Sequence, residues 1–382
     1  MRLIRVHLTA ILTALMTVLL LAAGTLTSVA SAQPATSAQP ARITGLASVP
    51  WSHVGVGWVL AQYTTAVPEG GKTGPAALYL ISPGGAKYKL ASWPDNRTAP
   101  QLLTWSPDGK RALFEVFSGQ GGVEQLTLAT GRVTRFALPG GATPIGYTTP
   151  GGLNIVASRL SGSQTILARY NLSGRLTRSL GSSTDGVVLY EPSGAAFVTG
   201  TSSGLKLVSN GGTLIRKLPV PGTSANTCNP ARWWNATTIL ASCAPPNTAA
   251  PQLWLVPLGG GRPAALTPRR SSSSRDLGDL DAWSLSSGLY LQAAGPCGVL
   301  QIFKQARNGS IKLVTVPHTT GDNHVLTASG SRLLIQAPTS CVGSNSLLWF
   351  NPGTHAEQWL LRSPSNVIGV ENAVPFYSRQ DA

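Results

Sequence analysis

The stretch Trp105-Ser-Pro-Asp-Gly-Lys-Arg-Ala-Leu-Phe-Glu115 places an aromatic residue, a tight-turn sequence and an apolar strand in direct succession. Similar hairpin patterns recur along the chain. Their equivalent positions are Trp51, Trp105, Tyr147, Tyr190, Trp234, Trp283 and Leu326. After Trp105 the spacing is 42 to 49 residues, and only the first interval, 54 residues, is stretched. A repeat of this length predicts one supersecondary unit stacked on copies of itself.

Each pattern is followed by a second hairpin, in which two strands flank a turn that mostly contains glycine or asparagine. The second hairpins are expected at Leu78–Leu90, Glu124–Leu138, Thr165–Leu180, Gly204–Leu218, Gln252–Leu266, Val299–Val314 and Ser346–Leu361. Glycine and asparagine supply the positive φ angles that short hairpin turns require. Short strands of alternating character fit the sequence better than helices, and no amphipathic helix is expected after residue 32.

Two hairpins per repeat make a four-stranded antiparallel blade. A lone blade cannot bury both faces, so it must pack against neighbours, and a ring leaves no blade uncovered. The sequence therefore predicts an all-β fold, a seven-bladed β-propeller, with six or eight blades as alternatives. The tail at Val374–Ser378 resembles Val49–Ser52, and we expect it to pair at the seam of the ring; the alternative is a frayed terminus.

The first residues have the pattern of a secretory signal. Arg2 and Arg5 precede an apolar run, and Ala30-Ser-Ala32 fits a cleavage site. An uncleaved membrane anchor is the alternative, but the run is slightly short for a bilayer. We expect a signal peptide over 1–32, a low-complexity linker over 33–42, one propeller domain over 43–378 and a tail over 379–382. The mature chain is expected to be a secreted or cell-surface monomer without a membrane span.

Four cysteines fit an exported chain, because disulfides persist outside the cytoplasm. Cys228 and Cys243 are nearly equidistant from the turn at Asn235, so they should face each other across one hairpin. Cys297 and Cys341 occupy corresponding places in the sixth and seventh repeats, and a bond between them would join adjacent blades. Free buried thiols are the alternative, and the spacing does not resemble a zinc site.

The chain has a formal net charge of +15, and its basic residues gather on the second hairpins. They are Lys87, Lys89, Arg132, Arg135, Arg175, Arg178, Arg216, Lys217, Arg262, Arg307, Lys312 and Arg362. Charge on an exposed edge strand prevents pairing with other sheets, which is one explanation. The other is a basic rim that holds an anionic envelope polymer. The export signal and the absence of a nucleic-acid-binding motif argue against nucleic acid as a partner.

Candidate ligand residues are few. Asp276, Asp279 and Asp281 lie in the connection into the sixth repeat, and Asp322 and His324 enter the seventh on the same expected face. Clustered carboxylates can hold Ca²⁺ through oxygen ligands, although this spacing matches no established calcium loop, and a plain solvated loop is the alternative. The insertion at Thr64–Ala76, with a Gly-Gly-Lys-Thr stretch, is expected on this face too.

A catalytic reading has weaker support. Gly200–Gly204 matches the G-x-S-x-G pattern of hydrolase nucleophiles, but that motif needs a strand-to-helix elbow and here lies between two expected strands. The histidines at positions 53, 318, 324 and 355 lie in or near turns and linking loops. No catalytic residue is assigned.

The stretch Leu103–Phe114 resembles the repeat of TolB-type, WD-like β-propellers, in which an aromatic-Ser-Pro-Asp-Gly-Lys sequence precedes an apolar strand. Tyr190-Glu-Pro-Ser-Gly194 and Leu326-Thr-Ala-Ser-Gly330 are eroded versions of it. The ring of Trp105 is expected to pack in the core and Asp108-Gly109 to close the turn, so these are not site residues. The resemblance implies a propeller used for binding, often at the bacterial envelope. The first repeat begins soon after the signal, without the extra N-terminal domain of TolB, so a role in that protein's complex is not expected.

Together these features predict a secreted, non-catalytic binding module at the cell envelope, whose partner is a protein or an anionic polymer. The alternative is a propeller enzyme, a hydrolase or lyase acting on glycans or lactones, with its site at the channel mouth.

Overall fold

The computed structural model describes residues 41–67, 73–116, 122–162, 164–184, 186–222, 228–244, 250–269, 277–295, 298–339 and 344–376. All of them belong to one compact unit, Ser37–Ala382. The expected signal, nearly all of the linker and the tail after residue 378 lie outside these ranges. Within the described residues the regular structure is β-strand, apart from three 3₁₀ turns: η1 (Leu46–Ser48), η2 (Trp51–His53) and η4 (Pro139–Gly141).

Five separate sheets each contain four antiparallel strands paired in chain order. The first two sheets are β5 (Gln101–Trp105), β6 (Arg111–Val116), β7 (Gly122–Thr127) and β8 (Arg132–Ala137), then β9 (Thr143–Tyr147), β10 (Asn154–Ser161), β11 (Gln164–Asn171) and β12 (Leu176–Ser183). The next is β13 (Leu189–Tyr190), β14 (Ala196–Thr201), β15 (Gly204–Ser209) and β16 (Leu214–Pro219). The last two are β17 (Cys228–Asn235), β18 (Thr238–Cys243), β19 (Gln252–Pro257) and β20 (Ala264–Ala265), then β21 (Asp279–Leu285), β22 (Gly288–Ala294), β23 (Leu300–Gln305) and β24 (Ile311–Leu313).

The remaining nine strands form one further sheet that contains both ends of the described chain. They are β1 (Arg42–Ile43), β2 (Val59–Thr64), β3 (Ala76–Ile81), β4 (Lys87–Trp93), β25 (His324–Ser329), β26 (Arg332–Pro338), β27 (Asn345–Asn351), β28 (Ala356–Leu361) and β29 (Gly369–Pro375). Its two halves meet at a single parallel bridge, Asn345 with Gly369. Divided there, it gives the set β25–β28 and the set β29-β2-β3-β4, with β1 paired outside β4.

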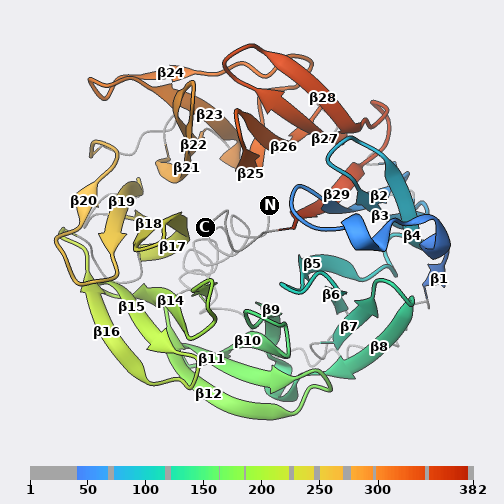
Figure 1. The fold of residues 1–382 in the computed structure, drawn as a ribbon, viewed down its shortest axis with the longest axis horizontal. Helices are drawn as coiled ribbons and strands as arrows, with labels where there is room; N and C mark the ends of the chain where they lie inside the picture. The colour runs from blue at the N-terminus through green and yellow to red at the C-terminus, as the bar shows by residue number, and fades with distance from the viewer. Residues whose placement is uncertain are drawn as a thin grey trace, which may run out of the picture. The chain divides into compact units, whose positions relative to one another are not determined.

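Seven hydrophobic clusters lie between successive sets of strands. One joins β2–β4 to β6 and β7, the next five continue in chain order, and the last joins β26 and β27 to β2 and β29. Each set therefore covers its apolar faces with both neighbours, including the last set with the first. Figure 1 shows the sets around a common axis, with β5, β9, β17, β21 and β25 nearest the centre. The fold is a multi-bladed β-propeller, and we infer seven blades, numbered by their innermost strands β29, β5, β9, β13, β17, β21 and β25.

The expected second hairpins are confirmed, because the bounds of each lie within, or one residue outside, the third and fourth strands of its blade. Pairing of the tail at the seam is confirmed too, since β29 pairs antiparallel with β2 from Val59–Pro375 to Thr64–Gly369. The expectation that Trp51 occupies the same position in the first repeat as Trp105 in the second was wrong. Trp51 lies in η2, where its Nε1 donates to the carbonyl oxygen of Leu46. The C-terminal strand supplies the innermost strand of blade 1 in place of the segment around Trp51.

The turn after Trp105 also links two blades. Gly109 has a φ of +72°, and Asp108 accepts hydrogen bonds from the Ser106 hydroxyl (2.5 Å) and the Lys110 N–H (3.1 Å). Arg111 pairs with Asp108 and donates to the carbonyl oxygens of residues 151 and 152, in the β9–β10 turn of blade 3. Trp105 itself is only 6% exposed, which confirms its expected core role.

In several blades, a side chain on the second strand bonds to the backbone of the next blade. Gln62 on β2 donates through Nε2 to the carbonyl oxygen of Pro100 (3.0 Å), and its Oε1 accepts from the N–H of Leu102 (2.7 Å). Corresponding bonds to the next blade come from the side chains of Ser242, Gln292 and Gln336. The last of these joins β26 of blade 7 to β29 of blade 1.

Cys228 and Cys243 form the expected disulfide, opposite each other on β17 and β18, and both are fully buried. Cys297 and Cys341 lie outside the described residues, so their pairing stays a prediction.

Replacing both Cys228 and Cys243 by alanine should lower the free energy of unfolding by roughly 3 kcal/mol, because the bond closes a loop of 15 residues in the unfolded chain. Urea unfolding of the double variant and the wild type without reductant measures the difference. Equal midpoints would show that the bond does not form in solution.

Gln62→Leu should lower the free energy of unfolding by about 1–3 kcal/mol, since it leaves the Pro100 carbonyl and the Leu102 N–H buried without this partner. Gln164→Leu, at an exposed position on β11, is the matched control and should change it by less than about 0.5 kcal/mol. Equal effects of the two substitutions would contradict the inter-blade role.

Candidate functional site: an aromatic cavity at one end of the channel

The two ends of the channel differ in what forms them. Antiparallel pairing makes the first and third strands of every blade finish at the same end of the channel, here called the turn end. The second and fourth strands finish at the other, called the connection end. The innermost strands start at the connection end and finish at the turn end.

A cavity of about 590 Å³ lies at the turn end. Its walls come from the last residues of the innermost strands and from the turns that follow them, in blades 1 to 5 and 7. They are Thr104, Trp105, Ser106, Pro107, Ile145, Gly146, Tyr147, Thr149, Val156, Val188, Leu189, Tyr190, Pro192, Ala231, Arg232, Trp233, Thr327, Val374, Pro375 and Phe376. Converging strand ends thus create one shared site.

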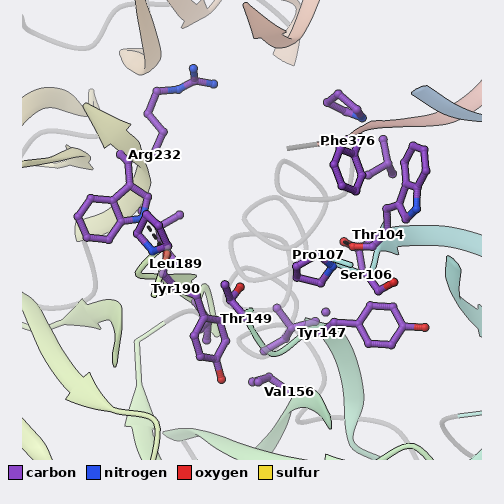
Figure 2. Close-up of a pocket in the computed structure, with 18 of the residues that line it drawn as sticks. Thr104, Ser106, Pro107, Tyr147, Thr149, Val156, Leu189, Tyr190, Arg232 and Phe376 are labelled. Carbon is purple, nitrogen blue, oxygen red and sulfur yellow. Dashed lines mark hydrogen bonds between the residues drawn. The ribbon is translucent and has the colours of Figure 1, made fainter. Parts of the chain in front are cut away.

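The lining is mainly aromatic, aliphatic and proline. Figure 2 shows the hydroxyl groups of Tyr147 and Tyr190 directed away from the centre of the cavity. The Tyr147 hydroxyl donates to Oε1 of Gln125 (3.1 Å) within blade 2, and burial raises the pKa of this tyrosine. Phe376 packs edge-on against Trp105, with ring centroids 5.0 Å apart. The rings therefore present carbon surface to the cavity and keep their polar groups in the walls.

Apart from the tyrosines, Arg232 is the one ionisable residue in this lining. Its Nε donates to Oδ1 of Asp281 at 2.8 Å, and its guanidinium lies 4.5 Å from the Trp283 ring centroid. Burial raises the pKa of Asp281, and the charge of Arg232 opposes that rise. Arg232 is thus held along the wall toward blade 6, as Figure 2 shows by its extended side chain.

Six of the innermost strands carry a register shift that adds a residue against the second strand, and β17 carries two: β5, β9, β17, β21, β25 and β29. In β29 the shift falls at Glu371. Such bulges bend a strand and redirect a side chain. Burial raises the pKa of Glu371 to about 7, and a hydrogen bond from Nδ2 of Asn96 (3.4 Å) opposes the rise.

Of the carboxylates expected to bind a ligand, Asp279 and Asp322 lie toward the connection end, whereas Asp281 contacts Arg232 of the cavity lining. Asp279 begins β21 and is buried, and Asp281 is paired with Arg232. Asp322 accepts the Leu300 N–H through Oδ1 (2.8 Å), and burial raises its pKa. His324 begins β25, and burial lowers its pKa to about 4. Asp276 lies outside the described residues.

No group of three or more His, Cys, Asp or Glu side chains that could hold a metal ion occurs in the described ranges. The Ca²⁺ site stays a prediction. Ser202 of the G-x-S-x-G stretch lies in the hairpin between β14 and β15, so the strand-to-helix elbow of hydrolases is not formed there. His318 Nδ1 is 3.3 Å from Oε2 of Glu357, while His53 lies in η2. In the part of the chain that the structure describes, no helix is long and apolar enough to cross a bilayer.

The basic residues of the rim lie where the sequence predicted. All twelve are exposed, and they lie on or beside the outermost strand of each blade. Glu357 is the one acidic residue of the outermost strands, all of which are described.

Sequence reasoning treated the repeated aromatic position only as core. Trp105, Tyr147 and Tyr190 are the signal that could have revealed the cavity. They occupy equivalent positions of successive repeats near the ends of innermost strands, and such positions converge in a ring. In blade 5 the lining residue is Trp233, one position before the expected Trp234. Phe376 is supplied by the C-terminal strand.

No protein-family model and no curated protein sequence matches the chain. Solved structures of similar fold include a puromycin-hydrolyzing peptidase of Mycobacterium tuberculosis, with 14% identity and a TM-score of 0.51 over 81% of this chain and 53% of that one. A prolyl endopeptidase structure has 12% identity and a TM-score of 0.52 over 83% and 52%. An oligogalacturonate lyase in complex with manganese has 14% identity and a TM-score of 0.46 over 78% and 83%. This chain spans about half the length of the two peptidases. At such identities the likeness to the two peptidases shows a shared β-propeller fold.

Glu371→Gln should remove a pH dependence of stability. A carboxyl whose pKa is raised on folding stabilises the fold most when it is protonated. Its contribution to the free energy of unfolding is therefore complete below the ordinary glutamate pKa and is lost as the pH rises through about 7. From pH 4 to pH 8, the free energy of unfolding of the variant should rise by roughly 2 kcal/mol relative to that of the wild type, as measured by urea unfolding. Glu191→Gln is the control and should follow the wild-type curve. A Glu371→Gln curve parallel to the wild type would contradict the assignment.

Proposed function

We propose that this protein is an exported, non-catalytic β-propeller that binds an envelope protein or an anionic polymer. The observation that carries the proposal is the cavity of about 590 Å³ at the turn end. Apolar concave sites of this size are where proteins take up ligands. In protein interfaces, one or two large side chains seated in such a pocket supply most of the binding energy.

A polypeptide segment fits this cavity best. The carbon surfaces of Trp105, Tyr147 and Phe376 favour an apolar or aromatic side chain, because ring contacts add to the free energy of apolar burial. The tyrosine hydroxyls are turned into the walls, so the lining offers few hydrogen bonds to a strongly polar ligand. An anionic polymer is supported instead by the exposed basic rim.

Other features support the same proposal. The resemblance of Leu103–Phe114 to TolB-type repeats implies a binding propeller at the envelope, and the buried disulfide suits an oxidising compartment. Residues 1–32 would direct the export and would then be removed. The carboxylates toward the connection end, with His324, remain candidate binding residues of a second, polar site.

An enzyme is the second candidate. The similarity in fold to two peptidases supports a hydrolase, whose site we would place at a channel mouth. Release of amine from proline-containing peptides or puromycin by the purified chain would favour this candidate over the binding module.

The test of the cavity is a selection from a library of defined peptides against the wild type and against Thr327→Trp. Thr327 is half-buried in the lining, so an indole there should fill part of the cavity. Peptides with large apolar side chains should bind the wild type and lose at least tenfold in affinity for the variant.

Thr315→Trp, at an exposed position outside the lining, is the matched control and should bind as the wild type does. Selected peptides that bind all three proteins equally, or a selection that yields none, would overturn the cavity as the binding site.

A further inference from the structure

Two neighbouring blades expose large apolar side chains at the turn end. Leu176 is 53% exposed at the start of β12, and Leu214 and Ile215 are 49% and 53% exposed at the start of β16. Leu153, 69% exposed, lies in the β9–β10 turn at this same end of blade 3. Single exposed leucines are ordinary, but a group on adjoining elements marks a surface that contacts something apolar.

Contacts between the two blades join the turn before Leu214 to the outer strands beside Leu176. Arg178 on β12 donates through Nε to the carbonyl oxygen of Gly211 (2.8 Å), in the β15–β16 turn. Arg169 on β11 donates to the carbonyl oxygen and to Oδ1 of Asn210 in that turn. The turn that precedes Leu214 therefore rests on the outer strands of blade 3, beside the strand that Leu176 begins.

Positive charge surrounds these apolar side chains. Arg175, Arg178, Arg216 and Lys217 are all exposed and lie within three residues of one of the leucines or of Ile215. In the described residues of blades 3 and 4, 143–219 without 163 and 185, Glu191 is the only acidic side chain. The surface is thus amphipathic and strongly basic.

We propose that this blade 3–4 surface docks on an anionic lipid surface. The charge would attract the headgroups, and Leu153, Leu176, Leu214 and Ile215 would insert among them, as the apolar residues of interfacial segments do. A soluble polyanion would use the basic residues but would leave the four apolar side chains in water. The combination therefore favours lipid over the polymer that the basic rim alone would suit.

This surface is distinct from the cavity, because none of its residues lines it. Both lie at the turn end, so docking would bring the cavity mouth close to the lipid surface. The proposal goes beyond the peptide-binding function and can fail independently of it.

The experiment is co-sedimentation of the mature chain with vesicles of phosphatidylglycerol and phosphatidylcholine, and with phosphatidylcholine alone. Binding is expected only to the anionic vesicles and should weaken with added salt. Substituting Arg175, Arg216 and Lys217 by glutamine should lower the partition coefficient by about fivefold for each charge removed. Leu176→Ser/Leu214→Ser/Ile215→Ser should lower it by roughly tenfold or more.

Matched controls lie elsewhere on the rim. Leu160→Ser changes a side chain that is 81% exposed near the connection end, and Arg307→Gln/Lys312→Gln removes charge from blade 6. All variants should keep the unfolding midpoint and the peptide binding of the wild type. Absence of vesicle binding would overturn the proposal. So would binding that the serine variant retains in full while polyphosphate competes for it, because that outcome assigns the surface to a soluble polyanion.

Discussion

The coverage of each sheet by its two neighbours is the constraint on which the rest of this molecule depends. Every four-stranded sheet has two apolar faces, and the seven clusters lie between successive sheets, the last of them between β26–β27 and β2–β29. A row of such sheets would leave two faces in water. When the row closes into a ring, these two faces cover each other. The closure also gathers the innermost strands around one axis, where the aromatic cavity forms.

The seam shows how strongly this constraint acts. The segment around Trp51 precedes blade 1 in the chain, yet the innermost position of that blade is taken by β29. Trp51 instead packs from η2 against the outside of the first cluster. Gln336 of blade 7 then bonds to the backbone of β29, as Gln62 of blade 1 does to the backbone of blade 2. The C-terminal strand is thus held to the preceding blade by the same kind of side-chain bond that is used elsewhere in the ring.

The periodicity predicted the sheets, the second hairpins, the pairing of the tail and the Cys228–Cys243 bond, because each depends on local alternation and on spacing. It did not predict the cavity. Tyr147 and Tyr190 looked like core residues, since a repeat shows which positions are equivalent but not how far each projects toward the axis. The bulges, such as that at Glu371, shift the register by one residue and are not visible in a pattern of period two. Asp281 looked like a free ligand because its partner Arg232 belongs to another blade.

The inner strand of blade 1 is made last. Val59 and Pro375, which face each other on β2 and β29, are roughly 300 residues apart in the chain. Local hairpins can form as the polypeptide emerges, but this contact must wait until synthesis has delivered β29. Until then the inner edge of β2 offers unpaired backbone groups that another strand could occupy. A chain that stopped a dozen residues early would keep nearly all of its hydrophobic core and still be an open arc.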